Sequence, residues 1–249
     1  MSGHSKWSSI KHKKAATDAK RGKLFTKLAR AISVAAREGG GDPEGNPSLA
    51  LAIDKARQNS MPKDNIQRAI DRGTGEGADA AAIERIVYEG YGPGGAAILV
   101  EAMSDNRNRT GSEIRHAFDR SGGNLGEPNS VAWMFEKRGV IVLDPGKYTE
   151  DDLIVAIDAG AEDVVAEADD LRVLTAPTDL TTVRKALEAE GIEIQSADLT
   201  MDPTTTVEVD EGSAKSLIRL METLDDHDDV DEVHANFDIP ADVMERVAG

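Results

Sequence analysis

The chain has 249 residues, no cysteine and a net charge of −17, with 39% hydrophobic and 30% charged residues. This composition excludes disulfides, thiolate metal sites and cysteine nucleophiles, and it is typical of a globular protein. No apolar run approaches the roughly 20 residues of a membrane span, and the basic N-terminus lacks the apolar segment of a secretory signal, so we expect a cytoplasmic protein without membrane contact.

Residues 1–37 carry the opposite charge to the rest of the chain. They hold ten Lys or Arg residues and one acidic residue, Asp18, for a net charge of +9, which leaves −26 on the remaining residues. A chain polarised in this way is typically built to bring one end against a polyanion. Residues 1–20, the basic arm, are polar apart from Trp7 and Ile10, which indicates a flexible arm or a short docked helix.

A helix is predicted from Arg21 to the three glycines at 39–41, which are a typical C-terminal breaker. Its apolar side chains recur mainly every four residues and form one stripe. The stripe consists of Leu24, Leu28 and Ile32, with Phe25, Ala29 and Ala36 alongside. The opposite side carries Lys23, Lys27, Arg30 and Arg37.

Two further helices are predicted before residue 73. Asn46 followed by Pro47 is a typical cap and first turn, Pro62 restarts the third helix, and Gly73 ends it. Residues 38–72 hold five basic and six acidic residues, so this part of the helical bundle is near neutral. Residues 73–79 are predicted to form a hinge.

The next block has strand patterns. Residues 84–91 and 96–103 are predicted strands separated by a Gly-Pro-Gly-Gly turn, and residues 105–123 contain a helix. Residues 130–138 are predicted to form a third strand, with Val131, Trp133 and Phe135 on one face.

Residues 139–200 follow the order βαββαβ of a ferredoxin-like unit. The ββαβ pattern of residues 84–138 lacks further strands and a second helix for a complete domain. We expect the C-terminal segment to supply them, with a strand at 204–210, a helix at 211–224 and a strand at 230–239. The predicted fold is therefore α+β, with an N-terminal three-helix domain followed by two α/β domains, the last a ferredoxin-like βαββαβ unit inserted into the middle domain. The expected boundaries are 1–76 for the basic arm plus helical bundle, 80–138 and 202–240 for the middle domain, and 139–201 for the inserted domain.

Four long segments of the chain resemble the YebC/PmpR family. They are GHSKWSSIKHKKAATDAKRGKLFTKLARAI near the start, NPSLALAIDKARQNSMPKDNIQRAI at 46–70, YEGYGPGGAAILVEAMSDNRNRT at 88–110 and GGNLGEPNSVAWMFEKRGVI at 122–141. The resemblance covers essentially the whole chain. The visible departure is Glu127-Pro128-Asn129, where the family has a plainer turn, and it should change only the shape of a loop.

The resemblance implies a three-domain protein, which agrees with the order of elements above. It also implies a probable transcriptional regulator that binds promoter DNA. A mitochondrial relative is a translational activator of a cytochrome oxidase subunit, and bacterial relatives are linked to the relief of ribosomes stalled on proline runs. The resemblance thus indicates the fold and a broad role, and leaves promoter DNA and ribosomal RNA both open as the partner.

The basic arm and the first helix are the first candidate nucleic-acid contact. The alternative is a solvated tail, as charge runs often are, but here the sign opposes the rest of the chain and two rings able to stack on a base lie among the lysines. Contacts would be mainly to phosphate. The candidates are Lys6, Trp7, Lys11, His12, Lys13, Lys14, Lys20, Arg21, Lys23, Lys27 and Arg30.

A second candidate contact is Arg107-Asn108-Arg109, at the entrance of the helix in 105–123. Arg and Asn can donate to phosphates or base edges, and a helix start favours an anion. The alternative is a loop in which these arginines pair with nearby acids such as Asp105 and Glu113. With the family resemblance, the functional interpretation is favoured.

Several other patterns are not interpreted as sites. The glycine-rich turn at 92–95 lacks the lysine of a phosphate-binding loop, and the acidic run at 225–232 lacks calcium-loop spacing and is predicted to be solvated. The five histidines have no metal-ligand spacing, and His116 is interpreted as a surface or packing residue. We predict no catalytic residue, metal or cofactor, and therefore no enzyme.

Three hypotheses follow: a DNA-binding transcriptional regulator, a translation factor that binds ribosomal RNA and so the ribosome, and a protein-interaction module with no nucleic acid. The sequence shows no recognition helix of a helix-turn-helix, no basic zipper and no RNP-type strand. The residues alone therefore support electrostatic contact to DNA and RNA equally. The oligomeric state is left open.

Overall fold

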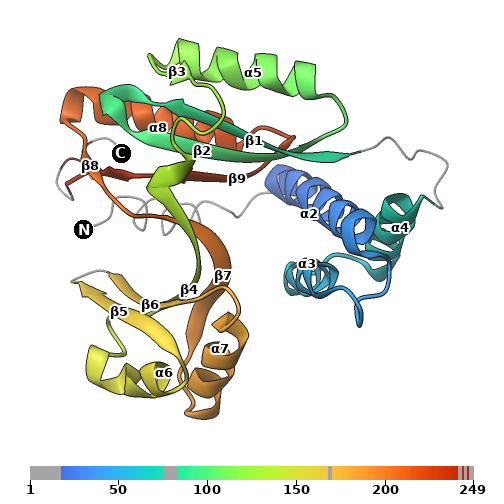
Figure 1. Cartoon of the computed structure of the whole chain (residues 1–249), viewed down its shortest axis with the longest axis vertical. Helices are drawn as coiled ribbons and strands as arrows, with labels where there is room; N and C mark the ends of the chain where they lie inside the picture. The colour runs from blue at the N-terminus through green and yellow to red at the C-terminus, as the bar shows by residue number, and fades with distance from the viewer. Residues whose placement is uncertain (1–17, 76–82, 168–169, 241–242, 244–245, 247–249) are drawn as a thin grey trace.

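The computed structural model describes residues 18–75, 83–167, 170–240, 243 and 246 (Figure 1). The predicted fold class is confirmed: within these residues, three helices precede two α/β domains, which occupy different ends of the molecule. Among the described residues, no helix is long and apolar enough to cross a membrane.

The N-terminal bundle consists of α2 (Asp18–Gly39), α3 (Pro47–Gln58) and α4 (Lys63–Thr74). Its core is built on the predicted stripe, with Leu28 and Ile32 packed against Leu49 and Ile53. Leu24, at the start of that stripe, is exposed instead. Asn46 caps α3 as predicted, by accepting a hydrogen bond from the Leu49 amide.

Gly73 does not end α4, because the helix continues to Thr74 and ends at Gly75, where φ is +84°. Gly73 lies where α4 contacts α2. A Cβ atom at this position would collide with the backbone carbonyl of Ser33, so only glycine permits such a close approach. The two helices are thereby held in tight contact near their C-terminal ends.

The middle domain has a four-stranded antiparallel sheet in the order β3-β1-β2-β9. Its strands are β1 (Glu84–Tyr91), β2 (Ala97–Ser104), β3 (Asn124–Leu125) and β9 (Val230–Ala235), and η1 (Pro93–Gly95) lies in the predicted β1–β2 turn. Helices α5 (Arg107–Arg120) and α8 (Glu211–Asp225) cover one face (Figure 1), where Ile98 and Val100 pack against Phe118 and Leu217.

The prediction of a strand over 130–138 is wrong for its first half. Ala132–Met134 form the turn η2, and the strand begins at Phe135. Val131 and Phe135 are buried against β2, but Trp133 is 69% exposed. The cause is the buried carboxylate of Glu89, which accepts hydrogen bonds from backbone amides on either side of Ser130, including those of Val131 and Ala132, and so bends the chain.

The predicted strand over 204–210 is also wrong in part. Only β8 (Val207–Glu208) forms, and it pairs in parallel with β10 (Phe237–Asp238) as a separate two-stranded sheet. Of the C-terminal strands, β9 alone joins the main sheet of the middle domain.

The inserted domain has the predicted ferredoxin-like order. It comprises β4 (Phe135–Leu143), η3 (Glu150–Leu153), α6 (Ile154–Asp158), β5 (Ala161–Glu167), β6 (Asp170–Thr175), α7 (Leu180–Ala189) and β7 (Ile194–Pro203). Its antiparallel sheet has the order β5-β6-β4-β7, which places the first and last strands side by side. Leu143 and Val173 of the sheet pack against Leu153 and Val183.

Two long strands connect the α/β domains. Strands β4 and β7 pair from Phe135–Pro203 to Leu143–Ile194, and Figure 1 shows them running from the middle domain into the inserted one. Both strands cross the residues at which the domain boundaries are expected. The connection is therefore a hydrogen-bonded ribbon and not a loop.

Candidate nucleic-acid interface

The candidate residues of the basic arm lie mostly outside the described part of the chain. These are Lys6, Trp7, Lys11, His12, Lys13 and Lys14. Lys20 and Arg21 belong to the first turns of α2. The contact of the arm with nucleic acid therefore stays a prediction.

Three of the candidate cations on α2, Lys23, Lys27 and Arg30, face the turn that follows α8. Lys23 donates through Nζ to the carbonyl oxygen of Asp226 at 3.1 Å, and Lys27 donates to that of Asp225 at 2.6 Å. Arg30 lies one turn further along α2 and reaches Asp229, with 2.6 Å between Nη1 and Oδ1. The cationic side of α2 thus packs against residues 225–232, which we call the acidic turn.

Asp229 is the centre of this contact. Its side chain is 3% exposed, and its second oxygen, Oδ2, accepts from Arg109 Nη2 at 2.7 Å and from Thr110 Oγ1 at 2.6 Å. Ser104 Oγ lies 3.2 Å from the same oxygen. One buried carboxylate therefore joins α2 of the bundle to β2 and α5 of the middle domain.

The surroundings of Asp229 favour its charged form. Burial alone would raise its pKa, but the hydrogen bonds from Thr110 and Arg109 and the positive charges of Arg30 and Arg109 together lower this pKa to about 2. The carboxylate is ionised at neutral pH and fully engaged. The prediction that the acidic run is solvated is therefore wrong at this residue.

The residues of the second candidate cluster, Arg107-Asn108-Arg109, have different surroundings in the structure. Asn106 caps α5 by accepting from the Arg109 amide, and Arg109 pairs with Asp229 and, at 3.1 Å, with Asp105. The ion-paired alternative therefore describes Arg109. Arg107 and Asn108 are exposed in the first turn of α5, where an anion would be favoured.

A second contact joins the bundle to both α/β domains. Lys55 Nζ of α3 lies 3.3 Å from Glu232 on β9 and 3.8 Å from Asp198 on β7. Burial would lower the pKa of Lys55, but the charges of Glu232, Asp198 and Asp231 together raise it. The bundle is thus held at two separate places by cations that contact acidic residues.

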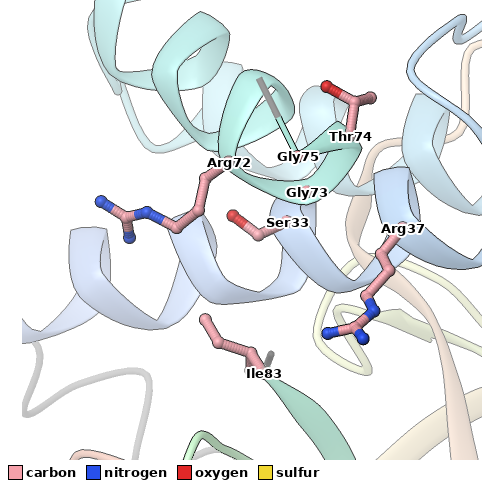
Figure 2. Close-up of a pocket in the computed structure, with 7 residues that line it drawn as sticks. All are labelled: Ser33, Arg37, Arg72, Gly73, Thr74, Gly75 and Ile83. Carbon is pink, nitrogen blue, oxygen red and sulfur yellow. The ribbon is translucent and has the colours of Figure 1, made fainter. Parts of the chain in front are cut away.

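A hollow of about 210 Å³ lies between the C-terminal ends of α2 and α4. Arg37 extends from α2 and Arg72 from α4 on two sides of it, with Ser33 between them and Ile83 below (Figure 2). Both arginines are exposed, and neither guanidinium has an ion pair with a described residue. Two such cations of the described chain thus line one concave surface of the bundle.

The sequence did not single out Arg37 and Arg72 as a pair. Arg37 continues the spacing of Lys23, Lys27 and Arg30 along α2, and this spacing indicates on which side of the helix it lies. Nothing in the sequence places it beside Arg72, because the close packing of α2 on α4 at Gly73 depends on the fold.

One group of side chains has the composition of a metal site. Glu113, His227 and Asp229 place one ligand atom each within 4.8 Å of one another. His227 accepts from the Asp229 amide at Nδ1 and contacts Glu113 at 2.9 Å through Nε2, so both ring nitrogens are used. Because two arginines occupy the Asp229 carboxylate, a cation there would be repelled, and we assign no metal to this group.

The chain matches two family models in succession. Residues 5–76 match the TACO1/YebC protein N-terminal domain, and residues 83–237 match the TACO1/YebC second and third domain. Together they cover the bundle and both α/β domains.

Similar proteins of bacteria match over their full length. A relative from Halothermothrix orenii is 57% identical over 251 residues, which cover 99% of each chain, and one from Rubrobacter xylanophilus is 56% identical over 250 residues, which cover 100% of each. Both are named "Probable transcriptional regulatory protein". A crystal structure of a conserved hypothetical protein from Aquifex aeolicus is 46% identical, with a TM-score of 0.82, and the match covers 93% of this chain and 96% of the other.

Proposed function

The chain belongs to the TACO1/YebC family, and from that premise we propose that it is a nucleic-acid-binding regulator of gene expression, which binds DNA as a transcriptional regulator. The relatives named above are regulatory proteins by their names, and they match this chain from end to end. The proposal assigns the chain no catalytic role and places it in the cytoplasm.

The observation that carries the proposal is the reversal of charge along the chain. Residues 1–37 hold +9, while residues 73–249, with 14 basic and 39 acidic residues, hold −25. The acidic domains repel a polyanion from most of the surface, but this repulsion is screened over about 8 Å at physiological salt. A basic segment at one end can therefore bind where the rest of the molecule does not.

The contacts of α2 divide the predicted site into two roles. Lys23, Lys27 and Arg30 are held by the acidic turn, and this supports a positioning role in which they fix the bundle to the middle domain. The residues that precede them, from Lys6 to Arg21, then carry the binding. Arg107 and Asn108 remain available as a secondary contact, since both are exposed.

The first test compares two variants of equal charge. Replacing Lys11, Lys13, Lys14, Lys20 and Arg21 with Ala should abolish binding to a labelled DNA duplex. The control variant removes five exposed cations of the α/β domains, Arg115, Arg120, Lys185, Lys215 and Arg219, and should retain binding. If the arm neutralises about six phosphates of a duplex, the arm should contribute about −5 to the slope of log affinity against log salt.

Equal affinities of the two variants at matched salt would contradict the proposal, because net charge and not the arm would then govern binding. The same titrations with ribosomal RNA separate the two nucleic acids. Tighter binding to RNA, together with cosedimentation with ribosomes that survives DNase, would replace transcription by translation as the role of the protein.

A further inference from the structure

The hollow between α2 and α4 has features that the basic arm does not explain. Its two cations, Arg37 and Arg72, have no ion pair with a described residue, although the chain holds 46 acidic residues against 29 basic ones. No acidic side chain of the described residues lines the hollow. In a chain this acidic, two exposed arginines that share one concave surface, with no carboxylate of a described residue in its lining, are available for an external anion.

The local electrostatics favour an anion in the hollow. Helix C-termini carry roughly −0.5 of an elementary charge each, so the ends of α2 and α4 offset about one of the two positive charges. The hollow keeps a net positive charge, presented on guanidinium groups, which match phosphate oxygens in planar, paired hydrogen bonds.

The size of the hollow indicates which kind of anion it suits. Its volume of about 210 Å³ is far above the 10–15 Å³ needed for one water, but lies below the roughly 300–1,000 Å³ of small-molecule sites. A phosphate group of a longer chain therefore fits better than a free nucleotide. Figure 2 shows the two guanidinium groups on different sides of the hollow, which suits two phosphates of one strand.

The framework under the two arginines is rigid. Ser33 Oγ lies 2.7 Å from the Ala69 carbonyl oxygen and so links α2 to α4, and the glycine at 73 lets the two backbones touch. The positions of the Arg37 and Arg72 backbones are consequently set by packing, so an anion has to order only the two side chains.

We infer that this hollow is a second contact for nucleic acid, in which Arg37 and Arg72 each bind one backbone phosphate of the strand held by the basic arm. The inference rests on the proposed function, since it names a further contact of the same partner. It places the contact at the opposite end of α2 from the arm, on the part of the bundle that the acidic turn leaves uncovered.

The test is the salt dependence of binding to a DNA duplex. The variant Arg37→Ala with Arg72→Ala should reduce the slope of log affinity against log salt by about 1.8, from about 0.9 for each phosphate, and should weaken binding roughly 20-fold at 0.2 M salt. Each single variant should give about half of the change in slope. Replacing both arginines with Lys should keep most of the slope, because the charges remain.

The matched control is Arg57→Ala with Arg68→Ala, which removes the same charge from exposed positions of the same bundle that already have local partners. It should leave the slope within about 0.3 of the wild-type value. The inference would be overturned if the slope is unchanged in the Arg37 and Arg72 variant, or if the control variant loses as much slope. Either result would leave the proposed function intact. Absence of salt-dependent binding by the wild-type chain would remove the proposed function and this contact with it. Circular dichroism of each variant establishes that it folds.

Discussion

Lys23, Lys27 and Arg30 lie on the same side of α2 as Arg37, yet the two sets of cations meet different surroundings. The first three contact the acidic turn through hydrogen bonds and an ion pair, whereas Arg37 is exposed at the edge of a hollow that Arg72 also lines. The sequence pattern is continuous from one set to the other. The difference shows that a basic stripe can be partly structural and partly free, and that only the fold separates the two parts.

The strongest way to break this comparison is to remove the carboxylate that holds Arg30. We expect Asp229→Ala to lower the free energy of unfolding by about 3 kcal/mol, because it leaves Arg30 and Arg109 facing each other without their shared partner. Urea unfolding of the whole chain measures this change.

Asp228 offers the matched control for that variant. It is the preceding residue of the acidic turn and its side chain is exposed, so Asp228→Ala should change stability by less than about 0.5 kcal/mol. Similar losses in the two variants would show that the whole turn acts by its net charge, and that Asp229 has no special role in holding α2.

Much of the fold could be predicted because its signals are local. The four-residue spacing of Leu28 and Ile32 gives the first helix, and the alternation of strand and helix patterns after residue 139 gives the ferredoxin-like order. The turn at Ala132–Met134 could not be predicted in this way. It depends on the Glu89 carboxylate, about 40 residues earlier in the chain, which accepts backbone amide hydrogen bonds there.

The candidate site was less predictable for the same reason. The types and spacing of the cations on α2 are visible in the sequence, but their partners lie about 200 residues away. The close approach of Arg37 to the end of α4 depends on Gly73, which the sequence pattern alone predicts to end the helix. Charge patterns thus indicate a surface, and long-range packing decides which part of it is left open.

The pH dependence of stability sharpens the comparison within the acidic turn itself. Asp229 has a pKa of about 2, below its ordinary value of 3.8, so its contribution to stability is present above pH 3.8 and is lost as the pH falls towards 2. For Asp231, burial and then the charge of Glu232 raise the pKa to about 6. Its effect has the opposite sign: the unfolded chain loses this proton first, so stability falls as the pH rises from 3.8 to 6.

We therefore expect Asp231→Asn to stabilise the chain at pH 7.5 by about 1–2 kcal/mol. This is less than the free energy that corresponds to a shift of the Asp231 pKa by two units, because the residue is only partly buried. At pH 3.5, where Asp231 is protonated in the native state and mostly protonated in the unfolded chain, the urea midpoints of the variant and the wild type should nearly coincide. A variant that is less stable than the wild type at pH 7.5 would show that the negative charge of Asp231 is needed by Lys55.

The smallest expected effect compares one cation from each set directly. Lys27 donates to the Asp225 carbonyl oxygen at 2.6 Å and is partly buried, so Lys27→Ala should lower the free energy of unfolding by about 0.5–1 kcal/mol. Arg37→Ala should leave it unchanged within about 0.5 kcal/mol, since Arg37 is exposed and has no ion pair with a described residue. Nucleic-acid affinity should respond in the reverse order, with the larger loss in Arg37→Ala. If Lys27→Ala instead loses affinity without losing stability, the acidic turn must release α2 when nucleic acid binds, and the two sets of cations form one continuous site.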